Sequence, residues 1–121
     1  MKHFTMNEFA CSHCGQLPPQ GMDPKLLAVL DKLRERLGEP LVISSGYRCP
    51  IKNANTPGAA SQSYHMQGLA ADVFIQSDNY SVYEIRDMAL ECGADTACAY
   101  PPGKGEFVHI DMRGYFQPGW V

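Results

Sequence analysis

The stretch SYHMQGLAADVFI, residues 63–75, carries the strongest structural signal in this chain of 121 residues. Its second half alternates as a β-strand does, with one face formed by Leu69, Ala71, Val73 and Ile75 and the other by Ala70, Asp72 and Phe74. Gly68 precedes this alternation and suits a tight turn into a strand, because glycine lacks the restrictions of a Cβ. The pattern predicts a strand with one aliphatic face and Asp72 on the opposite face.

A second strand is predicted near the end of the chain, from about Phe107 to Met112. In this segment Phe107, His109 and Asp111 alternate with three apolar residues. If the two strands pair, His109 and Asp72 face the same cleft. His65 then enters that cleft from the turn before the first strand.

Helices are predicted on both sides of these strands. Asp23 and Pro24 form a helix-start signal, and a leucine stripe follows until Gly38 and Pro40: Leu26, Leu27, Leu30, Leu33 and Leu37. Ser81 with Glu84 forms a capping box that opens a second helix through about residue 91. These leucines are typical of a helix that packs against a core.

The remaining segments complete a small domain. Short strands are predicted at residues 41–44 and 96–100, and residues 50–62 have the composition of a long irregular loop. The pattern indicates an α+β fold, a small antiparallel sheet with helices packed on one face. We expect one domain over residues 1–121, with residues 1–22 forming an N-terminal arm that acts as a lid or cap and an aromatic tail at residues 115–120.

Composition excludes several classes of partner. The net charge is −3 and the ten Lys and Arg are scattered, so nucleic-acid binding is not expected. No stretch approaches the roughly 20 apolar residues of a membrane span, and residues 1–15 lack the apolar core of a signal peptide. We expect a cytoplasmic chain without a signal peptide and without a membrane partner.

Five cysteines are an odd number and cannot all pair within the chain. Cys11 and Cys14 form one C-x-x-C, which could be half of a structural zinc knuckle, a redox pair or two small residues that pack in the arm. No second pair lies at knuckle spacing. We therefore favour packing or an adventitious disulfide.

Two histidines and one carboxylate form a possible metal site. His65, Asp72 and His109 suit zinc, and a catalytic zinc keeps three protein ligands and leaves one position for water. Isolated histidines are more often surface or core residues. The combination of S-x-H-x-x-G-x-A-A-D with E-x-x-H-I-D favours the metal interpretation, with one zinc per chain.

These motifs, together with SGYR at residues 45–48, resemble the zinc D-alanyl-D-alanine carboxypeptidases and dipeptidases and the related phage L-alanyl-D-glutamate endolysins. That group also contains lysostaphin-type enzymes and the hedgehog signalling domain. The resemblance runs from the EFAC arm through FVHIDMRG and is closest to small phage-type members. It implies a hedgehog-like peptidase fold, with zinc held by His65, Asp72 and His109.

The resemblance also implies roles for four other residues. Arg48 would bind a substrate carboxylate or carbonyl, with a loop salt bridge as the alternative. Ser63 would hydrogen-bond the substrate or stabilise a turn. Glu106 would be the general base, but in a regular strand it faces away from His109, so it needs a bend or bulge. Asp111 would orient a ligand imidazole.

The resemblance implies a zinc metallopeptidase that hydrolyses peptidoglycan stem peptides, as a D-Ala-D-Ala carboxypeptidase or a related endopeptidase. The position before the last histidine is Val108, where the best-known carboxypeptidases have an aromatic residue, so the bond that is cut stays open. One alternative is an inactive zinc-containing module that binds the cell wall or a partner. Another is a metal-free wall-binding protein. We expect a monomer of phage or bacterial origin that is released to the cell wall.

Overall fold

The computed structural model describes residues 3–57, 59 and 63–113, so the aromatic tail at residues 115–120 lies outside the described residues. Two 3-10 helices (η), three α-helices and four strands follow one another: η1 (Met6–Phe9), α1 (Pro24–Leu37), β1 (Val42–Ser45), α2 (Pro50–Ala54), η2 (Tyr64–Gln67), β2 (Ala70–Phe74), α3 (Val82–Glu91), β3 (Thr96–Tyr100) and β4 (Phe107–Asp111).

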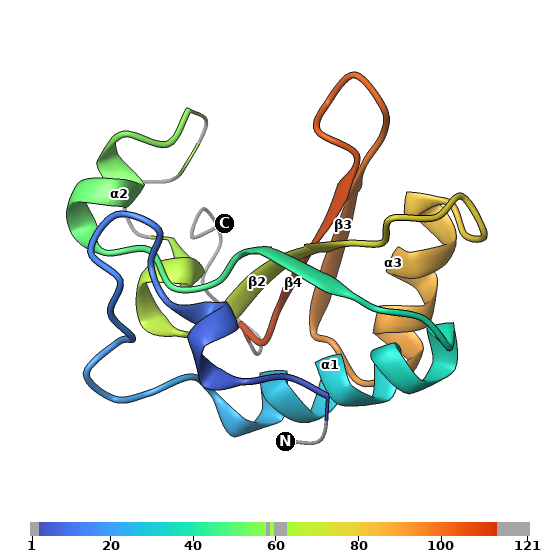
Figure 1. Ribbon diagram of the computed structural model, residues 1–121, viewed down its shortest axis with the longest axis horizontal. Coiled ribbons are helices and arrows are strands. Elements are labelled where there is room, and N and C mark those ends of the chain that lie inside the picture. The colour runs from blue at the N-terminus through green and yellow to red at the C-terminus, as the bar shows by residue number, and fades with distance from the viewer. Residues whose placement is uncertain (1–2, 58, 60–62, 114–121) are drawn as a thin grey trace.

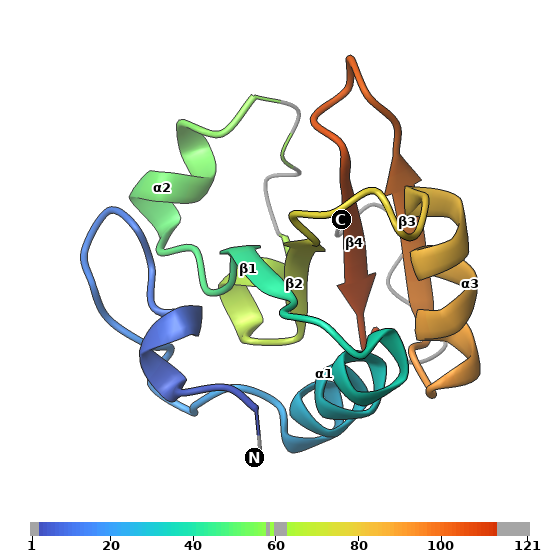
Figure 2. The ribbon, with the colours of Figure 1, turned by 45° about the vertical axis from the view of Figure 1, so that its right-hand side comes forward.

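The strands form one sheet in the order β1-β2-β4-β3, and every neighbouring pair is antiparallel. The order can be followed from left to right in Figure 2. In the central pair, Asp72 of β2 lies directly opposite His109 of β4. The predicted antiparallel sheet is therefore confirmed, including the pairing on which the metal site depends.

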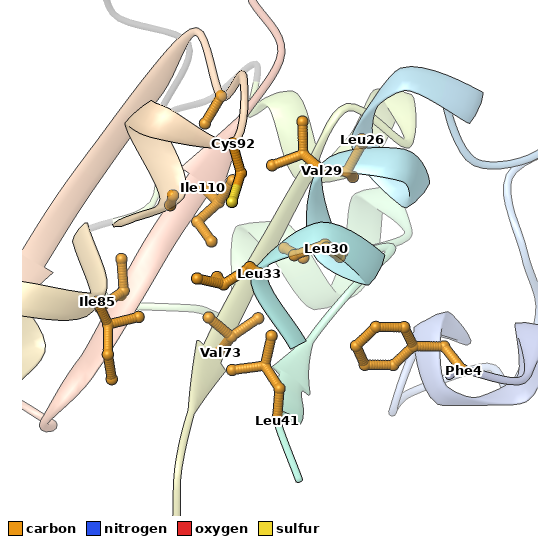
Figure 3. Packing of buried hydrophobic residues seen from close by; sticks show 14 of the residues in the cluster. Phe4, Leu26, Val29, Leu30, Leu33, Leu41, Val73, Ile85, Cys92 and Ile110 are labelled. Atoms are coloured by element: carbon orange, nitrogen blue, oxygen red, sulfur yellow. The ribbon is translucent and has the colours of Figure 1, made fainter. Parts of the chain in front are cut away.

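The two longer helices, α1 and α3, pack on one face of this sheet. The apolar residues of β2 and β4 that face them, among them Val73, Val108 and Ile110, are fully buried. Figure 3 shows side chains of α1, β2 and α3 gathered between the helices and the strands. The alternation predicted for residues 69–75 is therefore confirmed in β2, whose aliphatic face packs against the helices. Asp72 and His109 lie on the opposite face of the sheet.

The predicted helices are present, and one detail of their capping differs. Helix α1 ends at Gly38, whose left-handed backbone (φ 70°) accommodates the turn. Asp23 precedes α1 as expected, but its side chain makes no capping hydrogen bond, and Pro24 at the first helical position marks the start instead. The capping box of Ser81 and Glu84 is formed at the start of α3.

The irregular loop predicted at residues 50–62 is wrong in its first part, where α2 forms (Figure 1). Pro50 occupies the first turn, and the backbone N–H of Lys52 donates to Cys49 Sγ, which serves as the cap. A cysteine is an unusual cap, and it was not recognised as a start signal because Ser, Thr, Asp and Asn are the preferred residues.

The N-terminal arm is anchored in the core. Phe9 is fully buried, and Phe4 packs against it with the ring centroids 5.9 Å apart. The arm also touches the segment after β1, where the backbone N–H of Tyr47 donates to the carbonyl of Phe9 (2.8 Å). Across the described ranges, no helix combines the length and apolar character needed to cross a membrane.

Candidate functional site

The sheet register and one tight turn bring three possible ligands together. Asp72 and His109 are paired across β2 and β4, and His65 lies on η2, which precedes β2. Gly68 ends η2 with φ 72°, and a Cβ at this position would lie 2.7 Å from the carbonyl oxygen of Gly21. A glycine is therefore required both by the backbone conformation and by the close approach of the arm.

The three donor atoms converge at nearly equal distances. His109 Nδ1 lies 3.0 Å from Asp72 Oδ1, His65 Nε2 lies 3.2 Å from that oxygen, and the two nitrogens are 3.3 Å apart. All three residues are buried. Ligands about 2.05 Å from a tetrahedral zinc are about 3.3 Å from one another, so the spacing fits a zinc site.

The outer nitrogens of both imidazoles are held by acceptors. His65 Nδ1 lies 2.8 Å from the carbonyl oxygen of Gly46, and His109 Nε2 lies 2.8 Å from Asp111 Oδ2. A carbonyl or a carboxylate can only accept, so each outer nitrogen carries a proton, and in the neutral imidazole the inner nitrogen presents its lone pair. Such partners fix the orientation and tautomer of metal-binding histidines, and the residues present therefore fit zinc.

Asp111 is itself held by Arg113. The guanidinium donates to both carboxylate oxygens, at 2.9 and 2.6 Å, and its carbon lies 4.8 Å from the centroid of the Tyr64 ring. Burial raises the pKa of Asp111, but the bonds to Arg113 and His109 lower it by more. Sequence reasoning missed Arg113. Its position two residues after Asp111 was the available signal.

The charges in the cluster favour a cation at its centre. Burial raises the pKa of Asp72, but hydrogen bonds and charge interactions with the two histidines bring it far below its usual range. Burial lowers the pKa of His109, and its contacts with Asp111 and Asp72 raise it by more. The carboxylates of Asp72 and Asp111 thus stabilise positive charge on or between the imidazoles. A divalent cation bound there would supply that charge in place of protons.

The cluster opens into a cleft of about 290 Å³. Two cationic side chains, Arg48 and Lys104, and two stacked aromatic rings, Tyr100 and Phe107, contribute to its lining. These rings have centroids 4.5 Å apart and are nearly parallel. The cleft therefore offers a cation-binding floor, positive groups for an anionic ligand and a flat apolar wall.

Arg48 lies beside the metal ligands. Its Nη2 donates to Asp72 Oδ2 (3.3 Å) and its Nε donates to Ser45 Oγ (3.3 Å). Its backbone N–H donates to the carbonyl of His65 (3.1 Å). The loop salt bridge considered from the sequence therefore exists, and the same guanidinium also lines the cleft.

Two expected site residues lie elsewhere. Ser63 is fully buried, and its hydroxyl accepts from the backbone N–H of His65 (3.1 Å), the position of a turn-stabilising cap. Glu106 has the left-handed backbone that a bend requires (φ 52°), but its exposed side chain lines a separate pocket with Val73 and Val108. Neither is among the described residues that line the cleft.

The fold and the donor set together define a candidate zinc hydrolase. Comparison with protein-family models matches residues 2–111 to peptidase M15. The match covers most of the chain, and the protein belongs to the peptidase M15 family, whose members are zinc-dependent peptidases. The resemblance to this family of zinc peptidases, found from the motifs, is thereby confirmed. A comparison with curated proteins gives no match.

Proposed function

We propose that this protein is a zinc-dependent peptidase that hydrolyses peptide bonds in peptidoglycan stem peptides. The observation that best supports this proposal is that His65, Asp72 and His109 converge at a cleft that Arg48 also lines. Stem peptides contain D-amino acids and free carboxylates. A cleft with two cationic groups beside a metal site suits such an anionic peptide.

In this proposal His65, Asp72 and His109 would hold the zinc through the three atoms that converge, Nε2, Oδ1 and Nδ1. When bound, zinc polarises a peptide carbonyl and makes a water molecule more acidic. Arg48 binds a substrate carboxylate through its planar guanidinium, and the Tyr100–Phe107 pair supports the peptide chain. Burial, together with the neighbouring Cys98 and Asp72, raises the pKa of Tyr100, so its hydroxyl remains a hydrogen-bond donor.

Glu106 is proposed as the proton acceptor, and this role requires the β3–β4 turn to move. Lys104 of that turn lines the cleft, so the turn forms one of its walls. Gly103 and Gly105, on either side of Lys104, both have positive φ angles, 90° and 111°. Glycines can adopt backbone conformations that residues with a Cβ rarely reach, so this turn has the freedom to change shape. Substrate binding would rotate this turn and bring Glu106 over the cleft.

The cellular setting follows from the proposed substrate. A stem-peptide hydrolase must reach the cell wall, and we propose that this one acts there as a monomer after release, as a phage-encoded lysin would. Nucleic acid and membranes are not proposed as partners.

A second candidate is a zinc-containing module that binds the wall or a partner without hydrolysis. The position of Glu106 favours this alternative, because Asp72 is the only carboxylate among the described residues that line the cleft. Asp72 is needed as a ligand, so with Glu106 outside the cleft none of the described lining residues offers a second carboxylate to accept a proton.

The test compares hydrolysis with binding. Zinc-loaded protein is incubated with a pentapeptide stem ending in D-Ala-D-Ala and with cross-linked muropeptides, and products are identified by mass spectrometry. We expect cleavage by the wild type, a strong loss in Glu106→Gln, and no loss in Glu91→Gln, which changes an exposed glutamate at the end of α3. Release of D-alanine identifies a carboxypeptidase, and an interior cut identifies an endopeptidase.

Calorimetric titration with both peptides separates the two candidates. If zinc-loaded wild type binds a stem peptide and cleaves neither substrate, the non-hydrolytic module is correct. If Glu106→Gln cleaves as fast as wild type, the proposed role of Glu106 is wrong although the peptidase assignment survives.

A further inference from the structure

Three cysteines from two distant parts of the sequence lie together outside the cleft. Cys11 and Cys14 come from the N-terminal arm, and Cys49 follows Arg48 before α2. Their sulfur atoms all lie within 4.8 Å of one another. The sequence offered no second cysteine pair at knuckle spacing, but the fold supplies the third sulfur from the segment after β1.

The backbone of residues 11–16 forms a hydrogen-bonded turn that brings Cys11 and Cys14 close together. Cys11 N–H donates to the carbonyl of Gln16 (2.9 Å), and Gly15 N–H donates back to the carbonyl of Cys11 (2.7 Å). Gly15 has φ 73°, a conformation that favours glycine. The result is a tight hairpin in which the two cysteines occupy one closed turn.

Backbone N–H groups point at the buried sulfurs. His13 N–H and Cys49 N–H both donate to Cys11 Sγ at 3.4 Å, and Lys52 N–H donates to Cys49 Sγ at 3.4 Å. Burial raises the pKa of Cys11, but the N–H groups of Cys49, Cys14 and His13 lower it by more, to about 7. The environment of Cys11 therefore favours thiolate, the form that binds metals. A backbone hydrogen bond at Gln16 lowers the pKa of Cys14, but desolvation and the neighbouring Cys11 and Cys49 raise it by more, as expected when thiolates crowd together without a cation.

We propose that Cys11, Cys14 and Cys49 form a second metal site, which binds zinc through three thiolates and leaves its fourth position to water or an added donor. Three thiolates this close repel one another strongly, and a soft divalent cation removes that repulsion. Thiolates about 2.3 Å from a tetrahedral zinc are about 3.8 Å apart, so small side-chain rotations suffice. A disulfide would use two of the three sulfurs and leave the third unexplained.

The proposed site has a structural consequence. It joins the arm to residues 46–49, a segment that contains both Arg48 and the Gly46 carbonyl that accepts from His65. Zinc at the cysteines would hold this segment in place without taking part in catalysis. The inference does not depend on the proposed peptidase activity.

Zinc content tests the proposal directly. The protein is purified under reducing conditions without a metal-affinity tag, and zinc per chain is measured in wild type, His65→Ala, Cys14→Ser and the double variant. We expect two, one, one and none. Cys14 is exposed, so its substitution should not prevent folding, and Cys98→Ser on β3 is a matched control that should retain two.

Cobalt substitution identifies the ligands. Cobalt-loaded wild type, His65→Ala and Cys98→Ser should show a thiolate-to-cobalt charge-transfer band in the near ultraviolet, and Cys14→Ser should show at most a much weaker one. A wild type with one zinc that is lost entirely in His65→Ala would overturn the proposal. Absence of the charge-transfer band, or a Cys11–Cys14 disulfide found by mass spectrometry in the reduced preparation, would also overturn it.

Discussion

The histidine cluster and the cysteine cluster are built in different ways. His65, Asp72 and His109 are buried beside paired strands, their donor atoms are 3.0–3.3 Å apart, and each imidazole has an outer acceptor. The cysteines lie in connecting segments, and backbone N–H groups donate to the sulfurs of Cys11 and Cys49. The first cluster is organised by the sheet before a metal binds. The second depends on the packing of the arm against the segment after β1.

Gly46 connects the two clusters. Its carbonyl accepts from His65 Nδ1, and a Cβ on it would lie 2.6 Å from the Cα and the carbonyl oxygen of Phe9, two residues before Cys11. A change at this glycine is therefore expected to reach both clusters, whereas a change in either set of ligands should leave the other set intact.

Loss of a histidine-cluster ligand should have the largest effect. Asp72→Asn removes the charge of a buried ligand, and we expect peptide hydrolysis to fall by about 10³-fold or more, because metal polarisation is worth several kcal/mol. Zinc should fall from two to one per chain. Asp78→Asn, an exposed acid before α3, is the control and should change neither value. Loss of both zinc ions in Asp72→Asn would contradict the independence of the clusters.

Weakening an outer partner should have a smaller effect on the same cluster. In Asp111→Asn the amide can still accept from His109 but carries no charge, so zinc affinity at the histidine cluster should fall about 10–100-fold. Competition with a chelator measures both affinities in one titration. The cysteine-bound zinc should be unaffected, and equal weakening of the two sites would indicate general destabilisation instead.

Gly46→Ala should disturb both clusters. Contact between the new Cβ and the Phe9 backbone must push the arm away. We expect the free energy of unfolding to fall by about 1–3 kcal/mol and zinc to bind more weakly at both sites. Gly38→Ala is the comparison, because its Cβ meets nothing within 4 Å and its left-handed backbone alone should cost about 1 kcal/mol. Denaturation curves with and without zinc measure these values. Unchanged zinc affinity in Gly46→Ala would disprove the coupling.

The smallest effect is expected at Ser63. If its hydroxyl caps the turn that carries His65, Ser63→Ala should lower stability by about 1 kcal/mol and leave the KM for a stem peptide unchanged. Thermal unfolding and steady-state kinetics measure the two quantities. An increased KM with unchanged stability would instead support the substrate contact suggested by the resemblance.

The sequence predicts the histidine cluster better than the cysteine cluster for a physical reason. Asp72 and His109 occur in alternating segments, and alternation determines which side chains share a face once two strands pair. The helix starts and the turn at Gly68 are equally local signals. Cys49 and the Gly46 carbonyl reach their partners through tertiary packing of the arm, which no spacing in the sequence reveals.

Glu106 marks another limit of sequence reasoning. The need for a bend could be predicted from strand parity, and the bend is present at φ 52°. Its direction could not be predicted, because it depends on the two glycines of the turn and on where the turn packs. The caps at Ser63 and Cys49 were similarly ambiguous, since one hydroxyl or thiol can serve a turn or a ligand.

A crystal structure of the zinc-loaded protein, with anomalous diffraction collected at the zinc edge, tests the central claim most directly. We expect a peak about 2.0–2.2 Å from each of His65 Nε2, His109 Nδ1 and Asp72 Oδ1, with Asp111 still bonded to His109 Nε2. No peak among these three atoms, or coordination through His109 Nε2 with Asp111 displaced, would contradict the assignment of this cluster as the zinc site of a peptidase.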